Sequence, residues 1–252
     1  MAGTKTVTAR AWNTRLRRFN GFTSGIQSQL LRTVRRKAFD QIIADLPKIN
    51  RTALVLGSGP NPTPPKGLDP GWFLITINAS YRLARDLGLG VPDLTIVADV
   101  LPAVTAARAE AFARARTRLL VVNSATTFDP DLEPFLDRID FKADRIAYVT
   151  WAVRHALITE QIGQPLAFLG GPGISNGVYA PLLALKLGAP RVVMTGFSLG
   201  PGWYPSGDTT ARRIHAKEDR VACQRMAARG YPVFTSDPAF AEVTGLRLWE
   251  AA

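Results

Sequence analysis

The chain has 252 residues, enough for one large domain or two small ones, and 46% of them are apolar, as in a globular protein with a real core. Its single cysteine, Cys223, excludes a disulfide framework and a cysteine-ligated metal cluster. No apolar run reaches the roughly 18 residues of a membrane span, and the basic N-terminus lacks the apolar stretch of a secretory signal, so we expect neither.

The net charge of +11 is concentrated near the N-terminus. Residues 1–51 carry eleven Lys or Arg residues against Asp40 and Asp45, whereas residues 52–252 have an excess of only two positive charges. Apolar residues such as Trp12 and Phe19 lie among these charges. We therefore predict a basic helical arm over 1–51 that binds an anionic membrane surface. The alternative is a solvated helix packed on the domain by one face, and no nucleic-acid partner is expected.

From residue 52 onward, short apolar runs alternate with helical patterns. The runs that predict strands are 53–56, 73–77, 94–98, 119–122, 146–149, 166–169, 192–195 and 232–234. The helical patterns cover 81–87, 103–116, 151–162, 178–187 and 215–229. Several strand runs are continuously apolar, as in strands buried on both faces. The order predicts an α/β domain over 52–252, with a single doubly wound, mostly parallel sheet.

Small or polar residues follow most of the predicted strands, at the edge where sheets of this kind bind ligands. They are Gly57, Ser58, Gly59, Pro60 and Asn61 after the first strand, Asn78 after the second, Asp99 after the third, Ser175, Asn176 and Gly177 after the glycine-rich segment 170–173, and 196–198 after the strand 192–195. Glycine permits close backbone approach, and the amides of a helix N-terminus favour an anion. Together these turns predict a site for a phosphate-bearing ligand such as a nucleotide. Each turn alone is better explained as an ordinary capped strand-to-helix connection.

Several nucleotide and hydrolase sites are not expected. Pro62 stands where a dinucleotide fingerprint needs its third glycine, and no Gly-Lys-Ser/Thr sequence of a P-loop occurs. We also expect no hydrolase-type nucleophile elbow. The carboxylates Asp99, Asp208, Glu218 and Asp219 form no clear cation-binding pattern, so no metal is expected.

Only two histidines are present, and one of them is a candidate base. His155 lies inside a helical pattern and is expected to be structural or exposed. His215 opens the helical segment 215–229, directly after a loop that contains Gly, Trp, Tyr and Pro. Histidine, with an ordinary pKa of about 6.5, suits proton abstraction near neutral pH. The alternative for His215 is a surface or capping role.

The block "SNGVYAPLLALKLGAPRVVMTGFSL", with "HAKED" downstream, resembles bacterial sialyltransferases of glycosyltransferase family 42. That family has a Ser-Gly-Val-Tyr helix start, a strand that ends in Gly-x-Asp-Phe, and a later His with acidic residues after it. Its opening Gly-Asn-Gly-Pro-Ser turn is similar to residues 57–61 here, and its second strand ends in Asn, as Asn78 does here. The resemblance covers most of 52–238 and is specific over 175–219. The chain departs from it at Ser58, Asn61, Asn176 and the pair Phe197-Ser198.

The resemblance implies a Rossmann-like glycosyltransferase fold and an activity. The implied reaction is a metal-independent, inverting transfer of an acidic sugar, sialic acid or a Kdo-like sugar, from a CMP-sugar to a cell-surface glycan or lipid-linked saccharide. His215 would be the general base, and Tyr204 would donate to the leaving phosphate. Residues 57–61 and Asn78 would bind the CMP group, and Asn176 would contact the donor near its phosphate or ribose. Asp99 would either bind ribose or form a structural turn.

A cytoplasmic location at the inner membrane face follows from this reading, with no cofactor besides the donor substrate. More distantly, the turns resemble those of motility-associated and pterin-pyrophosphokinase-like proteins. Two alternatives therefore stay open: a pterin-type pyrophosphokinase that uses ATP and Mg²⁺, and a nucleotide-binding module without catalytic activity.

Overall fold

The computed structural model describes residues 40–59, 62–98, 109–110, 112–126, 128–163, 173–200 and 214–250. The chain forms two compact units, Met1–Gln41 and Ile42–Ala252, and the sheet belongs to the larger one. The expected basic arm lies mostly outside the described residues. Within the larger unit, Leu46 and Ile49 are buried, and the Ile49 N–H donates to the Leu187 carbonyl over 2.8 Å. Residues 42–51 therefore pack with the α/β domain.

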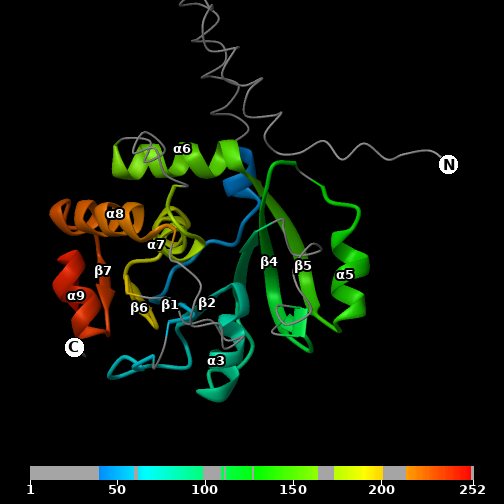
Figure 1. Ribbon diagram of the computed structural model, residues 1–252, viewed down its shortest axis with the longest axis horizontal. Coiled ribbons are helices and arrows are strands. Elements are labelled where there is room, and N and C mark those ends of the chain that lie inside the picture. The colour runs from blue at the N-terminus through cyan, green and yellow to red at the C-terminus, as the bar shows by residue number, and fades with distance from the viewer. Residues whose placement is uncertain are drawn as a thin grey trace, which may run out of the picture. The chain divides into compact units, whose positions relative to one another are not determined.

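One eight-stranded sheet organises this unit (Figure 1). Its strands are β1 (Ala53–Leu56), β2 (Phe73–Ile77), β3 (Leu94–Ala98), β4 (Arg116–Ser124), β5 (Lys142–Thr150), β6 (Val192–Thr195), β7 (Val233–Thr235) and β8 (Arg247–Leu248). Every residue of β1, β2 and β6 is buried, and apart from Thr76 and Thr195 these residues are apolar, as in strands covered on both faces.

The strands run in the spatial order β5-β4-β3-β2-β1-β6-β7-β8, and every pair is parallel. The chain moves outward from β1 to β5 and then returns to place β6 on the other side of β1. This reversal creates a topological switch point between β1 and β6, where Leu56 is in register with Thr195. The expectation of a single doubly wound, mostly parallel sheet is confirmed.

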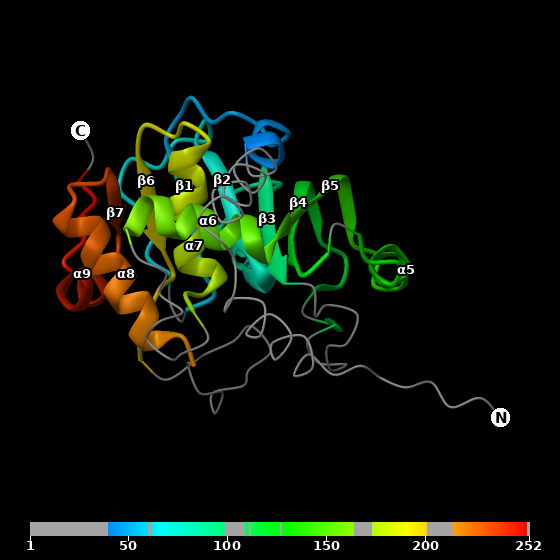
Figure 2. The same cartoon turned by 90° about the horizontal axis from the view of Figure 1, so that it is seen from above.

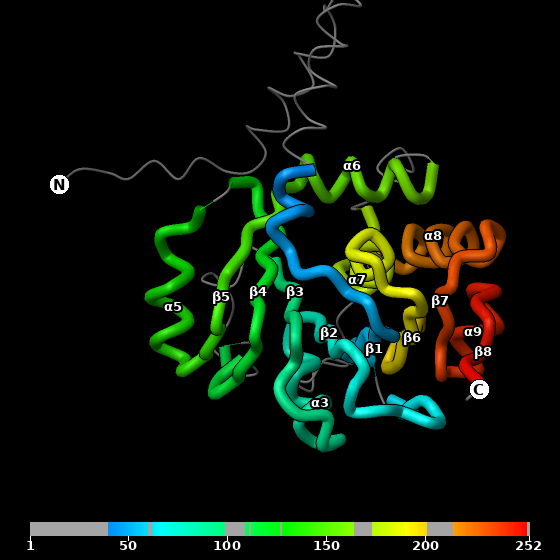
Figure 3. Tube along the Cα trace, turned by 180° about the vertical axis from the view of Figure 1, so that it is seen from behind, coloured from blue at the N-terminus to red at the C-terminus, as the bar shows by residue number. Residues whose placement is uncertain are grey.

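Helices cover both faces of the sheet (Figures 1 and 3). They are the 3₁₀ turn η1 (Asn78–Ser80) and the α-helices α3 (Tyr81–Asp86), α5 (Leu132–Arg138), α6 (Trp151–Ile162), α7 (Asn176–Lys186), α8 (Ala216–Ala228) and α9 (Pro238–Thr244). Helix α7 is buried from Gly177 to Ala184 and packs over β1, β2, β3 and β6. In Figures 1 and 3, α6 and α8 lie on the same side of the sheet as α7, and α3 lies on the opposite side.

The core on the α3 side joins strands of the sheet to the helices that cover them. Tyr81, Leu120, Val122 and Phe135 belong to one buried cluster that joins α3, β4 and α5. Seen from above, α5 lies beside β5 at one edge of the sheet, and α8 and α9 lie at the other edge (Figure 2).

The structure corrects several expected boundaries. The helical pattern 103–116 was expected to run into Arg116, but that residue begins β4. Among the described residues, the helix ends before Arg114, whose φ of 57° is left-handed and whose N–H donates to the Ile139 carbonyl. The expected strand 166–169 lies outside the described residues.

Besides the 3₁₀ turn η1, three elements were not expected from the sequence. Helix α9 has a clear local signal, because Asp237 caps its N-terminus and Pro238 is its first residue. Helix α5 is short and contains Pro134, and β8 has only two residues, both exposed. None of the described helices is both long and apolar enough to cross a membrane.

Candidate functional site

The turns after β1 and β6 meet at the switch point. The Gly57 N–H donates to the Thr195 carbonyl over 2.8 Å, and the Gly59 N–H donates to the Gly196 carbonyl over 2.7 Å. A Cβ atom at Gly57 or at Gly59 would lie 2.5 Å from the Gly196 oxygen, so neither position accepts a side chain without a shift of the backbone. Glycine is therefore required at these two positions of the predicted donor turn, because the backbone of Gly196 passes so close to them. Pro60 and Asn61 lie outside the described residues.

The turn after β2 is tied to the end of β1. The Ser80 hydroxyl donates to the Leu56 carbonyl over 2.6 Å and accepts from the Ile77 N–H over 2.8 Å. Asn78, half-buried, begins this turn with a left-handed φ of 53°, a conformation that asparagine tolerates better than most residues. The structure therefore places Asn78 at the carboxyl edge of β2, next to the β1 turn.

The N-terminus of α7 packs against the same corner. Ser175 caps the helix, and its Oγ accepts from the Val178 N–H over 3.3 Å. A Cβ at Gly177 would lie 2.7 Å from the Phe197 ring, and one at Gly57 would lie 3.0 Å from the same ring. The Phe197 ring thus joins the turn after β1, the turn after β6 and the first turn of α7. Helix N–H groups there are suited to an anion.

Asn123, at the end of β4, also reaches this helix start. Its Nδ2 donates to the Asn176 Oδ1 over 2.8 Å, although the two residues are 53 positions apart. The side chain of Asn123 is fully buried. We did not predict Asn123 as a site residue. The signal was present, because Asn123 and Ser124 follow an apolar strand as Asn78 does.

Three side chains hold the backbone that leads into α7. His215 shares a hydrogen bond of 2.7 Å between Nδ1 and the Gly173 carbonyl. The Arg154 guanidinium donates to the Ile174 carbonyl, and the Asp219 Oδ1 accepts from the Ser175 N–H over 2.7 Å. We call residues 173–175 the donor-turn segment. His215 and Asp219 come from the start of α8 and Arg154 from α6, so two helices fix this segment.

The bond to Gly173 also decides the tautomer of His215. A carbonyl oxygen can only accept, so the Nδ1 of His215 carries the hydrogen. In the neutral imidazole, Nε2 is then the nitrogen with a free lone pair. His215 thus has the form that a general base requires. His155, by contrast, is exposed on α6.

Arg154 is a buried cation beside this segment. Only 6% of it is exposed, and its guanidinium carbon lies 5.2 Å from the centre of the Tyr179 ring. Burial lowers the pKa of Arg154, whereas Tyr179 and Asp219 raise it. Burial also raises the pKa of Tyr179, whose hydroxyl has no hydrogen-bond partner among the described residues. The cation–π contact and the nearby Asp219 carboxylate offset part of the cost of burying Arg154.

Two segments have the Gly-x-Ser-x-Gly spacing of a hydrolase nucleophile elbow, Gly173–Gly177 and Gly196–Gly200. Neither forms an elbow. Ser175 is an extended N-cap, and the Ser198 Oγ accepts from the Gly200 N–H over 3.0 Å. Neither serine is among the described residues with a positive φ, so the strained conformation of an elbow serine is absent from both.

Of the remaining predicted residues, some lie in the described part of the chain and others lie outside it. Ser58 lies in the β1 turn and is half-buried, whereas Tyr204, Asp99 and Asp208 lie outside the described residues. Glu218 and Asp219 are both buried in the first turn of α8. Within the described ranges, no group of three His, Cys, Asp or Glu side chains could hold a metal ion.

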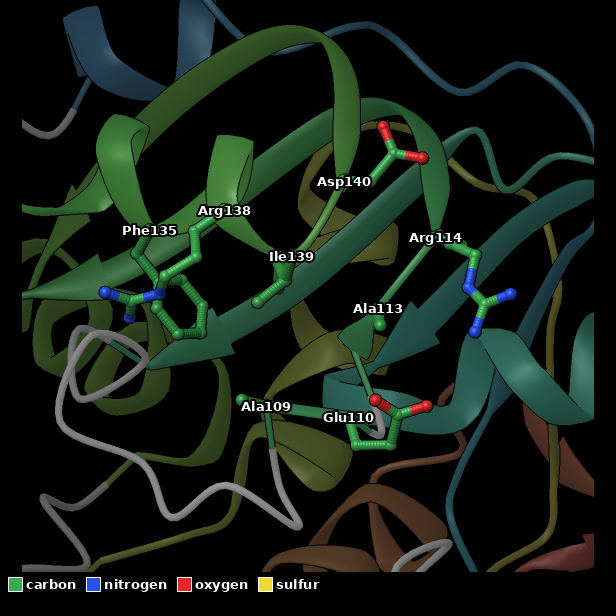
Figure 4. Close-up of a pocket in the computed structure, with 8 residues that line it drawn as sticks. All are labelled: Ala109, Glu110, Ala113, Arg114, Phe135, Arg138, Ile139 and Asp140. Atoms are coloured by element: carbon green, nitrogen blue, oxygen red, sulfur yellow. The ribbon is translucent and has the colours of Figure 1, made fainter.

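A cavity of about 640 Å³ lies away from this corner (Figure 4). It is lined by Ala109, Glu110, Ala113, Arg114, Phe135, Arg138, Ile139 and Asp140. Arg114 comes just before β4, and Asp140 comes just before β5, so the cavity lies at the amino edge of the sheet. Ligands of doubly wound sheets bind at the opposite edge. We therefore assign the candidate site to the switch point and not to this cavity.

The fold is thus a parallel α/β fold in which Gly57 and Gly59 cross closely over Gly196 at the switch point. Comparison with protein-family models finds no match, and neither does comparison with curated proteins. Among solved structures, the chain is similar in fold to the monofunctional α-2,3-sialyltransferase Cst-I from Campylobacter jejuni, with a TM-score of 0.52, 16% identity and coverage of 81% of this chain and 83% of that one.

It is also similar to the sialyltransferase CstII from Campylobacter jejuni, solved in complex with the substrate analogue CMP-3FNeuAc. That match has a TM-score of 0.51 and 13% identity, and it covers 79% of this chain and 85% of that one. At this identity the likeness establishes the fold. The expected sialyltransferase-like architecture is therefore confirmed.

Proposed function

We propose that the protein is a glycosyltransferase that moves an acidic sugar, sialic acid or a Kdo-like sugar, from a CMP-sugar to a glycan acceptor. The observation that carries this proposal is the junction at the switch point. There the β1, β2 and β6 turns and the α7 N-terminus converge, and the backbone leading into α7 is bonded to the Nδ1 of His215, which leaves Nε2 free for the acceptor. The likeness in fold to a sialyltransferase solved with a CMP-sugar analogue supports it.

The donor side is formed by the glycine crossing and by the α7 N-terminus. The backbone of Gly57, Ser58 and Gly59 would lie against the nucleotide, because the crossing with Gly196 holds this turn at the carboxyl edge of β1. Asn176 and the first N–H groups of α7 would face the phosphate. Pro60, Asn61, Asn78 and Asp99 complete the proposed donor set.

The acceptor side is formed by His215. The acceptor oxygen forms a bond to the anomeric carbon of the sugar while the bond from that carbon to the phosphate oxygen breaks. The proton of the acceptor hydroxyl moves to the His215 Nε2, and CMP leaves with the bonding electrons. Attack opposite the leaving group inverts the anomeric centre. Tyr204 would donate a hydrogen bond to the leaving phosphate.

The reaction as proposed requires no metal, because CMP leaves with a single phosphate that N–H and O–H donors can stabilise. The acceptor would be a cell-surface glycan or a lipid-linked saccharide made at the inner membrane face. The basic segment 1–51 would hold the enzyme near that anionic surface.

The test is a thermal-shift series with CMP, UDP, GDP and ATP, each with Mg²⁺ and with EDTA. CMP should raise the melting temperature equally in both conditions. At a hundred times its Kd, a ligand adds about 2.7 kcal/mol to the free energy of unfolding. A shift with ATP and Mg²⁺ alone would favour a pyrophosphokinase. CMP binding without turnover of any CMP-sugar would favour a binding module.

A further inference from the structure

A pair of asparagine amides lies under the helix start that would face the donor. Asn123 is in register with Ala98 of β3 on one side and with Val149 of β5 on the other, so it is enclosed in the sheet. Its Nδ2 donates to the Asn176 Oδ1 over 2.8 Å. The Asn123 Oδ1 is buried and has no hydrogen-bond partner among the described residues. The contact with Asn176 is thus the polar interaction that the structure gives this buried side chain.

The direction of this bond determines what Asn176 offers at the helix start. An amide side chain has an oxygen that accepts and a nitrogen with two donors. Asn176 directs its oxygen to Asn123, which leaves its Nδ2–H₂ group as the donor end. Asn176 is the first residue of α7, where free backbone N–H groups also donate. An Nδ2 donor adds to this set, whereas an amide oxygen would repel an anion.

We propose that Asn123 is a positioning residue that fixes the Asn176 amide so that its Nδ2 hydrogens face the phosphate of the donor. The inference rests on the proposed function, because it concerns the phosphate of a CMP group. It adds a residue that the resemblance did not point to. It also explains how an asparagine can bind a phosphate at this turn. A hydroxyl rotates to donate or accept, whereas an amide must be held with its nitrogen end toward the phosphate.

The first experiment compares the binding of CMP with that of cytidine by calorimetry. The proteins are the full chain and its Asn123→Ala, Asn176→Ala and doubly substituted variants. Each single substitution should weaken CMP binding by about tenfold and should change cytidine binding by less than twofold, since cytidine lacks the phosphate. The double variant should bind CMP no more weakly than Asn176→Ala, because the two residues act through one contact. Equal losses for cytidine and CMP would overturn the proposal.

The direction of the bond is tested by Asn123→Asp. A carboxylate cannot donate to the Asn176 oxygen but attracts its Nδ2, so it should reverse the amide. This variant should lose more CMP affinity than Asn123→Ala. Wild-type CMP affinity in Asn123→Asp would mean that Asn176 is the donor of the pair, which overturns the proposal. The matched control is Thr76→Val, which removes the buried 2.8 Å bond to Thr95 and should leave the CMP-to-cytidine ratio unchanged.

A second measurement separates this inference from the proposed function. Urea unfolding of the same four proteins gives the coupling between positions 123 and 176 without any ligand. If the wild type binds no CMP, the proposed function fails whatever the coupling is. If CMP binds but the coupling is near zero, the role of Asn123 fails and the proposed function stands. Should Asn123→Ala not fold, Asn123→Ser replaces it in both experiments.

Discussion

At the scale of single residues, the bond between His215 and the Gly173 carbonyl bears most directly on the proposed reaction. It fixes the hydrogen on Nδ1 and so assigns the basic lone pair to Nε2. It also links the proposed base to the turn that would hold the donor. A histidine without this partner would populate both tautomers, and in the proposed reaction only the one with a free Nε2 would take the proton of the acceptor.

We predict that His215→Ala lowers kcat by about 10²- to 10⁴-fold, because the acceptor hydroxyl then has no general base. The Kd of CMP should rise by only a few-fold, through the lost bond to the Gly173 carbonyl, since the side chain acts mainly on the acceptor. Single-turnover kinetics and calorimetry measure the two effects. His155→Ala, at an exposed position of α6, is the control. Near-normal turnover of a true donor and acceptor by His215→Ala would refute the assignment of the base.

Tyr81 gives a prediction about alkaline stability. Burial raises its pKa from 10.0 to about 12, against the opposing effect of Arg82 and Arg85. The folded state therefore holds this proton more tightly than the unfolded state. The resulting stabilisation is complete below pH 10 and declines as the pH rises from 10 to about 12.

At pH 8 the free energy of unfolding of Tyr81→Phe should be about 0.5–1.5 kcal/mol lower than that of the wild type. The reason is that the Tyr81 hydroxyl donates a hydrogen bond to the Ala113 carbonyl over 3.1 Å. Above pH 10 the stability of this variant should fall less steeply than that of the wild type. Urea unfolding at pH 8, 10 and 11 measures both effects. Parallel stability curves for the two proteins would show that Tyr81 ionises equally easily in the folded and unfolded states.

At the scale of elements, α8 supports the N-terminus of α7. Asp219 is 4% exposed and accepts from the Ser175 N–H, so one helix supplies both the proposed base and a clamp on the donor-turn segment. The two partners are 44 residues apart in the sequence. A movement of α8 would therefore displace the proposed base and residues 173–175 together.

Asp219→Ala should destabilise the domain by about 1–3 kcal/mol, since it leaves the Ser175 N–H without its acceptor. CMP affinity should fall as the turn loosens. Asp219→Asn keeps an oxygen that can accept from the Ser175 N–H. It should therefore lose much less stability and much less CMP affinity than Asp219→Ala. Urea unfolding and calorimetry provide the data, with Lys217→Ala, an exposed residue of the same turn, as the control. Equal losses in the Ala and Asn variants would point to the charge of Asp219 rather than to this bond.

At the scale of the whole molecule, the division into two units separates the basic segment from the α/β domain. Residues 1–41 contain nine Lys or Arg residues and one acidic residue, Asp40. Leu46 and Ile49 lie in the larger unit and are buried there. The boundary relevant to a truncation is therefore residue 41 and not residue 51.

Deletion of 1–41 should leave a folded domain with nearly unchanged stability and at least tenfold weaker binding to anionic vesicles at low salt. Each basic residue near such a surface contributes about 1 kcal/mol. Deletion of 1–49 should also destabilise the domain, since each buried Leu or Ile contributes about 1.5–3 kcal/mol. Vesicle sedimentation and thermal melting measure these effects. Undiminished vesicle binding after the first deletion would contradict a membrane role for the arm.

The sequence by itself determined the class of fold and most of its elements. Continuous apolar runs such as Leu54–Leu56 and Val192–Thr195 indicate strands buried on both faces, and the turns after them are visible as glycine and polar residues. The cap at Ser175 is equally local, since its Oγ accepts from the Val178 N–H. These features depend on neighbours within a few residues, so the sequence pattern contains them.

Only the tertiary structure decided which of these turns meet. The placement of β6 beside β1 brings Gly59 against Gly196, and the sheet order brings Asn123 under Asn176. The bonds from His215 and Asp219 to the donor-turn segment join residues more than 40 positions apart. No local pattern specifies such partners, because a buried polar side chain is satisfied by whichever backbone group the packed helices and strands bring within reach of it.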